Sequence, residues 1–292
     1  TFNKYPLKVN FCKICFHNQL SIAVKKEKLF KNYLYLSSQS KTLQNHFDNS
    51  AKIYIKKFKL KKNSNIIDIG SNDGIALKSF IKFGYKKTVG IEPARNVAKM
   101  ANKNGIKTIN SFLNEKTLQK LNSKFDLVLA SNVFAHNENI KQLGENLIKL
   151  LKPKGILVIE VQYLINMLEK NIYDNIYHEH IHYWSANCLN KLFKRYNSDV
   201  FKFEKIDTHG GSLRCYIKLK QNKSYKINTK KFLIMEKRKG LEDEKLYKKF
   251  SNKIKYQKIN FTKFLSKNKK KKYCGLRCSS QDINFVKLFQ HK

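Results

Sequence analysis

The sequence predicts an α/β fold, a doubly wound Rossmann-like sheet, and three observations lead to this prediction. Between residues 65 and 161, short apolar runs typical of buried parallel strands alternate five times with helical stretches. The first run ends in a loop with two glycines, a feature of turns that bind nucleotides. Two strand-like runs, at residues 200–207 and 213–220, follow the alternation and could complete the sheet.

The elements of this alternation follow in chain order. Five apolar runs are expected to form strands, at residues 65–70, 87–92, 105–109, 125–130 and 156–161. The stretches between them are expected to form helices, at residues 74–83, from Ala94 onward, at 114–121 and at 138–151. KPKG (152–155) is expected to be a turn before the fifth strand. Because parallel strands need crossover helices, the alternation predicts a parallel sheet.

The segments on either side of the alternation have weaker patterns. Residues 1–40 suggest short strands and turns. Helices are expected at about 41–60, 162–170 and 185–196, and Lys-rich helix over 228–268. From these changes we predict three regions, which are residues 1–40, 41–222 and 223–292.

Composition limits the classes of function. The chain of 292 residues is 41% hydrophobic, which is enough for a sizeable core. Its formal net charge is +39, but only five of the 60 basic residues are Arg, and the Lys are spread along nearly every segment. Phosphate and base recognition favours Arg, so we expect a solvated lysine surface and no specific nucleic-acid partner. We see no signal peptide and no membrane-spanning run, so a cytoplasmic protein without a membrane partner is expected, of undetermined oligomeric state.

The loop IIDIGSNDG (66–74) predicts a cofactor site. A buried strand ends there, the glycines permit a tight turn, and the next helix directs its N-terminus at the loop. The glycine spacing differs from the dinucleotide fingerprint, and two aspartates would repel a pyrophosphate. These acids suit a cationic ligand such as S-adenosylmethionine (SAM). The expected contacts in this loop are Asp68, Gly70, Ser71, Asn72, Asp73 and Gly74.

Further cofactor contacts are expected where later strands end. Glu92 ends the second strand, where a carboxylate can accept hydrogen bonds from both ribose hydroxyls, and Pro93 follows it. Ser111 and Phe112 follow the third strand, where an adenine would lie, and Asn132 follows the fourth. The structural alternative is an ordinary glycine turn with an acidic cap. The loop, the strand-end acid and the alternation together favour SAM binding over that alternative.

A second cluster of ionisable residues lies in YHEHIHYW (177–184), which contains a formal H-E-x-x-H motif. On a helix this motif binds zinc and supplies a general base. The β-branched and aromatic residues here, followed by Ser185 as a helix cap, favour a loop or an extended strand instead. We therefore do not expect a metalloprotease. A set of acid–base residues for other chemistry and a plain structural strand remain open.

A series of motifs runs along almost the whole chain. They are CKIC (12–15), YLYLSSQSKTLQNH (33–46), IIDIGSNDGIALKSF (66–80), GIEPARNVA (90–98), SNVFAH (131–136), EVQYL (160–164), YDNIYHEHIHYWS (173–185) and THGGSLRCY (208–216). In this order they resemble the sugar C-methyltransferases, which methylate carbon 3 of nucleotide-linked 4-keto-deoxysugars. The resemblance implies a class I SAM-dependent methyltransferase sheet of seven strands with the last one antiparallel. It also implies SAM as the cofactor and a nucleotide-linked sugar as the substrate.

The same resemblance implies roles for individual residues. His180, the last His of Y-H-E-H, would be the general base that removes the proton next to the keto group and leaves an enolate. Tyr177 and Glu179 would orient or stabilise the substrate. His136 would face them from the end of the fourth strand, and Tyr33 would close over the sugar.

One of these assignments has an open alternative, and one further residue is a candidate. Tyr35 could take the place of Tyr33, because both lie in the same motif. His209 in THGGS is a further candidate member of the site. The main hypothesis requires Tyr177, Glu179, His180 and His136 to converge beside the Gly70 loop, and YHEH on the far face of the sheet would contradict it.

The resemblance is incomplete near the N-terminus. Cys12 and Cys15 match the metal ligands of the family's zinc-binding module, but a structural zinc site normally has four ligands. His17 would be a poor substitute for a cysteine. We expect the other pair to lie before Thr1, and therefore only a partial zinc module within residues 1–40.

The C-terminal end departs from the family as well. After about residue 270 the sequence is only weakly similar to the start of the family's second α/β domain. Residues 223–292 are therefore expected to be a helical linker and the truncated start of that domain. Cys274 and Cys278 are not expected to be ligands.

Other functions stay open at this point. SAM-binding residues do not specify an acceptor, so a SAM-dependent methyltransferase with another small-molecule acceptor is one alternative. An inactive SAM-binding fragment is a second. A basic nucleic-acid-binding protein is a third, but no segment gathers Arg with stacking aromatics as RNA recognition would require.

Overall fold

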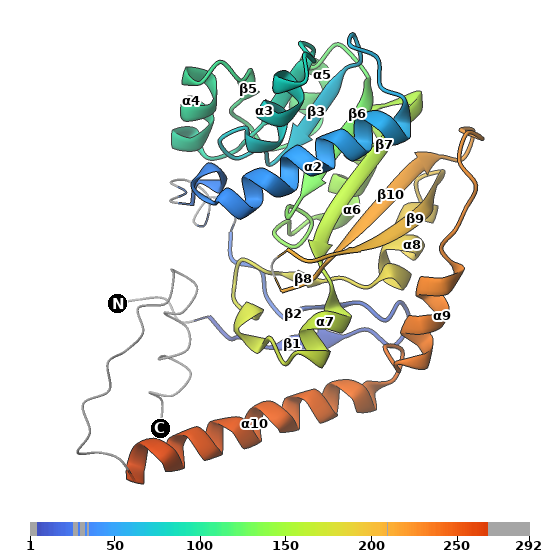
Figure 1. Cartoon of the computed structure of the whole chain (residues 1–292). Coiled ribbons are helices and arrows are strands. Elements are labelled where there is room, and N and C mark those ends of the chain that lie inside the picture. Colours follow the sequence, from blue (N-terminus) through green and yellow to red (C-terminus); the bar gives the residue numbers. More distant parts are fainter. Residues whose placement is uncertain (1–4, 26–28, 30–32, 34, 209, 268–292) are drawn as a thin grey trace.

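A seven-stranded mixed sheet with helices on both faces forms the centre of the computed structural model (Figure 1). The structure describes residues 5–25, 29, 33, 35–208 and 210–267. In spatial order the strands are β5 (Thr108–Ile109), β4 (Thr88–Ile91), β3 (Ile66–Ile69), β6 (Phe125–Ser131), β7 (Leu151–Gln162), β10 (Ser212–Leu219) and β9 (Ser198–Ile206). The first five are parallel, and β10 runs antiparallel to β7 and β9. The predicted doubly wound sheet with an antiparallel last strand is confirmed.

The strand order reverses next to β3. Ile66 pairs with Thr88 of β4 on one side and with Leu127 of β6 on the other. Crossover helices therefore leave β3 and β6 toward opposite faces, which opens a crevice at the carboxyl ends of these strands. This crevice is the position where α/β sheets bind ligands.

Helices cover the sheet on both faces. They are α2 (Lys41–Phe58), α3 (Ile75–Lys82), α4 (Arg95–Lys103), α5 (Glu115–Lys120), α6 (Ile140–Lys149), α7 (Leu164–Glu169), α8 (Ala186–Lys194), α9 (Lys230–Arg238) and α10 (Glu244–Lys267). Strand β6 shows how the two faces divide, since Leu127 packs with α2 and α3, and Val128 packs with α6 and α8. Alternate residues of a strand point to opposite faces, so one apolar run supplies both cores.

A second, three-stranded sheet joins distant parts of the chain. Strands β1 (Val9–Phe11) and β2 (Asn18–Leu20) form a hairpin, and β2 pairs with β8 (His182–Tyr183). The short 3-10 helices are η1 (Ser37–Gln39) and η2 (Tyr173–Asn175). The N-terminal hairpin is thereby held against the segment that follows YHEH.

The expected turn at residues 152–155 lies inside a strand, because β7 is assigned from Leu151 to Gln162. KPKG is looped out of the pairing with β6, since Phe125 pairs with Leu151 and Leu127 with Ile156, and a Cβ on Gly155 would lie 3.0 Å from the backbone N of Lys152. Gly155 makes this possible, because a Cβ there would lie 2.5 Å from the carbonyl oxygen of Phe125 on the neighbouring strand. The register between β6 and β7 shifts at this point, which accommodates the close approach.

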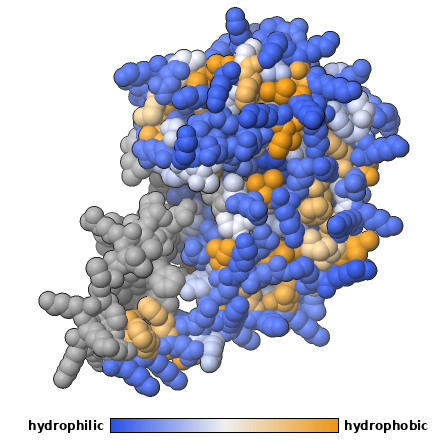
Figure 2. Space-filling model, in the orientation of Figure 1, coloured by the Kyte–Doolittle hydropathy of each residue, from blue (hydrophilic) through white to orange (hydrophobic). Residues whose placement is uncertain are grey.

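The outer surface is mostly hydrophilic on the face drawn in Figure 2, with apolar residues scattered over it. Helix α10 passes beneath β1, where the rings of Phe11 and Tyr247 lie 4.6 Å apart between centroids, and it has no buried residue (Figure 1). None of the helices in the described part of the chain is both long and apolar enough to cross a bilayer.

Candidate active site

The loop after β3 has the shape that a cofactor site requires. Gly70 and Gly74 have positive φ angles of 67° and 83°. A Cβ on Gly70 would lie 2.5 Å from Cγ2 of Val133, so a larger residue would push the loop away from β6. Ser71 Oγ and Asp73 Oδ1 are buried without a hydrogen-bond partner. Buried polar atoms are normally paired, so these two fit contacts with a bound ligand.

Two buried carboxylates lie at the same edge of the sheet. Burial raises the pKa of Asp68 well above its usual value, and the nearby charges of Glu92 and Glu160 raise it further. Burial likewise raises the pKa of Glu92, although the backbone N–H groups of Asn72 and Ala94 donate to its oxygens at 2.9 and 2.8 Å. Carboxylates held so close together favour a cationic ligand. The predicted SAM contacts in this crevice therefore fit a ligand with a sulfonium and an ammonium group.

The remaining predicted cofactor residues lie at neighbouring strand ends. Pro93 follows Glu92 directly, and its carbonyl accepts a hydrogen bond from the side chain of Asn110. The backbone N–H of Ser111 donates to the carbonyl of Glu92 at 3.2 Å, which places Ser111 and Phe112 beside the β4 loop.

Asn132 lies at the end of β6, on the other side of β3 from Glu92. It has a positive φ of 58°, and its N–H donates to the carbonyl of Glu160 at 2.8 Å. All the predicted cofactor residues thus flank the carboxyl ends of β3, β4, β5 and β6.

The YHEH segment is a turn. The N–H of His180 donates to the carbonyl of Tyr177 at 3.0 Å, and strand β8 begins only at His182. The helix that an H-E-x-x-H zinc site requires is absent, as expected from the sequence. Among the described residues no group of three or more His, Cys, Asp or Glu side chains could hold a metal ion.

Hydrogen bonds fix the tautomer of His180. Nδ1 lies 2.9 Å from the carbonyl of Asn175, and because a carbonyl only accepts, Nδ1 carries the proton. Nε2 therefore has a lone pair, to which the hydroxyl of Tyr177 donates at 3.1 Å. An imidazole held in this way presents one basic nitrogen.

His136 joins this turn from the loop after β6. Its Nδ1 donates to the carbonyl of Glu179 at 2.9 Å, and its ring lies 5.0 Å from that of His180 between centroids. Burial and the neighbouring His180 lower the pKa of His136 to about 3, so the ring is neutral near pH 7. Burial also raises the pKa of Glu179.

Tyr33 connects the turn with the cofactor residues. Burial is the main cause that raises the pKa of Tyr33, and the charges of Glu179 and Glu92 raise this pKa further. The phenol therefore lies within electrostatic range of both acids. Burial is also the main cause that raises the pKa of Tyr177, and electrostatic interactions with Glu179 and Tyr33 raise this pKa further. Tyr35 is exposed on the whole, but partial burial of its phenol raises the pKa, and the charge of Asp73 raises this pKa further. Tyr35 therefore lies nearer the cofactor loop. His209 lies outside the described residues.

The predicted zinc site is not supported by the described residues. Cys12 is exposed and Cys15 is partly buried, and together they supply two ligands of the four that a structural site needs. His17 does not complete the site, because its Nε2 lies 2.9 Å from Nδ1 of His182. Cys274 and Cys278 lie outside the described residues.

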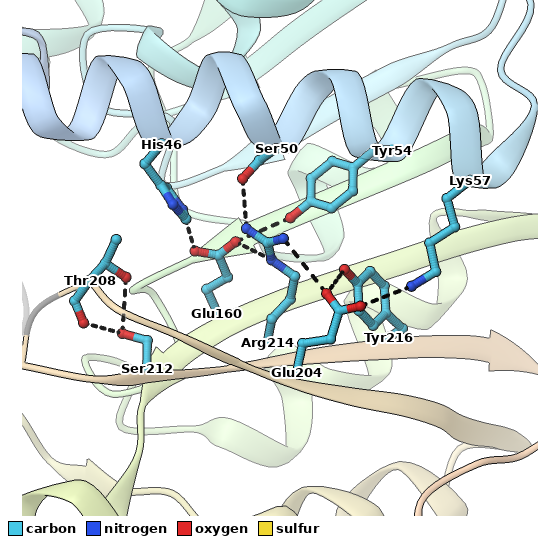
Figure 3. Close-up of polar contacts among 10 residues, drawn as sticks. All are labelled: His46, Ser50, Tyr54, Lys57, Glu160, Glu204, Thr208, Ser212, Arg214 and Tyr216. Carbon is cyan, nitrogen blue, oxygen red and sulfur yellow. Dashed lines mark hydrogen bonds and ion pairs between the residues drawn. The ribbon is translucent and has the colours of Figure 1, made fainter.

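Figure 3 shows a buried polar network that the sequence did not predict. Glu160 of β7 binds Nε of Arg214 on β10 at 2.6 Å, Nε2 of His46 at 2.8 Å and the hydroxyl of Tyr54 at 3.1 Å. Arg214 also donates to Ser50 at 2.6 Å. His46, Ser50 and Tyr54 recur every four residues, so they lie on one face of α2. The sequence did contain one sign of this network, because Glu160 and Arg214 are charged residues inside two otherwise apolar strands.

Comparison with known proteins agrees with this geometry. The sequence model of a methyltransferase domain matches residues 29–202, and that of a C-methyltransferase C-terminal domain matches residues 207–276. The C-methyltransferase NovU of Streptomyces niveus is 30% identical over 212 residues, which are 72% of this chain and 50% of NovU. A ubiquinone biosynthesis O-methyltransferase of Rickettsia canadensis is 32% identical over 111 residues, 36% of this chain and 44% of that protein. The chain thus spans half or less of the length of these relatives.

Solved structures show the same fold at low sequence identity. The PH0226 protein of Pyrococcus horikoshii OT3 has a TM-score of 0.52 and 14% identity, over 67% of this chain and 99% of that one. A chain of the complex between the Haloferax volcanii Trm112 methyltransferase activator and its methyltransferase partner has a TM-score of 0.51 and 15% identity, over 62% and 94%. The domain match extends over more than half of the 292 residues. The chain therefore belongs to the family of SAM-dependent methyltransferases and has their Rossmann-like α/β fold.

Proposed function

We propose that this protein transfers a methyl group from SAM to the carbon next to the keto group of a nucleotide-linked 4-keto-deoxysugar. The observation that supports the proposal is the packing of His180 against Tyr177 and His136, together with a Tyr33 phenol within electrostatic range of both Glu179 and Glu92. The similarity to a C-methyltransferase supports transfer to carbon. The sugar and its nucleotide are part of the proposal, on the strength of the motif series in the sequence.

Carbon becomes a nucleophile only after a proton leaves it. The lone pair on Nε2 of His180 is the proton acceptor in this proposal, and the carbonyl of Asn175 stabilises the imidazolium that forms. The C–H electron pair moves into the keto group and gives an enolate. SAM held by the strand-end residues would supply an electrophilic methyl group for the enolate carbon, and S-adenosylhomocysteine would be the leaving group.

The enolate oxygen needs donors that are already in place. The hydroxyl of Tyr33 is suitable, because its pKa is raised and the group stays protonated at working pH. The hydroxyl of Tyr177, which donates to Nε2 of His180 in this structure, becomes a second donor once Nε2 has taken the proton of the sugar carbon. Glu179, whose pKa is also raised, would orient the sugar hydroxyls. Neutral His136 fixes the turn through the carbonyl of Glu179.

The test is a methyl-transfer assay on the full chain with methyl-¹³C SAM. The acceptors are the thymidine and uridine diphosphate forms of 4-keto-6-deoxyglucose, with NMR to identify the atom that is methylated. We expect a new carbon–methyl bond next to the keto group. His180→Asn should reduce the rate by about 100-fold or more, the usual contribution of a general base.

His178→Asn is the matched control. This residue lies in the same turn but points toward Tyr5, with ring centroids 6.0 Å apart. It should retain most of the activity. Methylation of an oxygen, or equal losses in the two variants, would contradict the proposed chemistry and favour another acceptor.

A further inference from the structure

We infer that Asn96 is a positioning residue that couples the cofactor site to the acceptor site, by holding Tyr33 in place from the first turn of α4. The inference rests on the proposed function and adds a residue to it. It comes from a segment called here the strap, Tyr33 together with residues 35–39, which lies across the cofactor loops.

Asn96 binds both backbone groups of Tyr33. Its Oδ1 accepts from the N–H of Tyr33 at 3.3 Å, and its Nδ2 donates to the carbonyl of Tyr33 at 2.7 Å. A side-chain amide that pairs with both groups of one residue acts like a neighbouring β-strand. Asn96 is otherwise exposed, so its side chain has no role in the core.

The cofactor loop holds the other end of the strap in the same way. Asn72 Oδ1 accepts from the N–H of Ser37 at 2.9 Å, and its Nδ2 donates to the carbonyl of Tyr35 at 3.1 Å. The N–H of Ser38 donates to Asp73 Oδ2 at 3.1 Å. Five hydrogen bonds therefore join the described part of the strap to two places, three to the loop after β3 and two to the first turn of α4, directly after the loop that contains Glu92 and Pro93.

Glu92 connects these two loops. One carboxylate oxygen accepts from the N–H of Asn72 and the other from the N–H of Ala94, two residues before Asn96. Ribose hydroxyls bound at Glu92 would hold this carboxylate, and through it the backbone that presents both asparagines. Ordering the cofactor loops would then order the strap.

The strap carries the coupling to the acceptor site through Tyr33. Its phenol lies within electrostatic range of both Glu92 and Glu179, one acid from each site. If a first ligand orders a segment, a second ligand that needs the same order binds with less entropic penalty. The structure thus predicts that cofactor and acceptor bind with positive cooperativity, and that Asn96 transmits part of it.

Hydrogen–deuterium exchange on the full chain tests this without an acceptor. S-adenosylhomocysteine is the probe, and peptides across residues 33–40 report on the strap. In the native chain, saturating S-adenosylhomocysteine should slow exchange of the strap about tenfold. In Asn96→Ala this slowing should be lost around Tyr33 and retained around Ser37 and Ser38, which Asn72 and Asp73 still hold.

Asn102→Ala is the matched control. Asn102 lies on the same helix and binds both backbone groups of Thr108, at 3.0 and 2.8 Å, away from the strap. It should keep the whole response. Two results would overturn the inference and leave the proposed function standing. In the first, S-adenosylhomocysteine still slows exchange at Tyr33 in Asn96→Ala. In the second, bound S-adenosylhomocysteine does not change exchange of the strap in the native chain. Calorimetry on the same samples shows whether the probe binds, and failure to bind would overturn the proposed function and this inference together.

Discussion

At the scale of single residues, the carboxylates at the strand ends determine how this site meets its cofactor. Asp68 and Glu92 are buried near each other, and both pKa values are raised. Burial and the neighbouring carboxylate charges both disfavour the ionised form of Asp68. A sulfonium and an ammonium group would reverse the preference, because they stabilise the ionised forms.

SAM affinity should therefore increase with pH. The pKa of Asp68 is higher without the ligand than with it, so binding is weaker below that pKa and releases protons. Calorimetry between about pH 5.5 and about pH 8.5, in two buffers of different ionisation enthalpy, measures both effects. Asp68→Asn should bind more weakly and lose most of the pH dependence. Binding that is independent of pH in the native chain would contradict this account.

At the scale of elements, the buried network in Figure 3 fastens helix α2 to the sheet. Burial alone would raise the pKa of Glu160, but the His46 hydrogen bond and the Arg214 charge lower it to about 2. Because the pKa of Glu160 is lower in the folded chain than in the unfolded chain, its ionisation stabilises the fold at every pH above the unfolded-state pKa. This stabilisation is lost as the pH falls from that value toward 2. The charge of Glu160 also raises the pKa of Asp68, so the network lies within electrostatic range of the cofactor residues.

Arg214→Met should lower the free energy of unfolding by about 3–5 kcal/mol, because it leaves Glu160 buried without its cation. Urea denaturation at pH 7 measures the change, and the deficit should shrink at lower pH as Glu160 becomes protonated. Lys149→Met is the control, since Lys149 pairs with Glu115 and Glu145 on the exposed surface. Similar stability of the two variants at pH 7 would mean that the network does not hold α2.

At the scale of the whole molecule, the sequence predicted the parts that depend on local pattern. Five strand–helix alternations, the glycine loop and Glu92 can be read from neighbouring residues, and the strands and helices between residues 65 and 161 form in the expected order. The network around Arg214 and the strap contacts of Asn96 could not be read in this way. They join residues far apart in the chain, and an exposed Asn in a helix has no pattern that marks its partner.

The convergence of the YHEH turn with His136 required the whole fold as well. The N–H groups of Ile181 and His182 both donate to the carbonyl of Ala135, at 2.7 and 3.2 Å, which draws the turn onto the end of β6. Strand β8 continues this connection by pairing with β2.

Solvent exchange at the sugar carbon tests the central claim most directly. The full chain, saturated with S-adenosylhomocysteine, would be incubated in D₂O with a 4-keto-6-deoxy sugar nucleotide that calorimetry shows to bind. Because no methyl group is available, only removal and return of the proton can occur. We predict deuterium at the carbon next to the keto group in the native chain and in His178→Asn, and about 100-fold slower exchange in His180→Asn. No exchange by the native chain, or unchanged exchange in His180→Asn, would contradict His180 as the base.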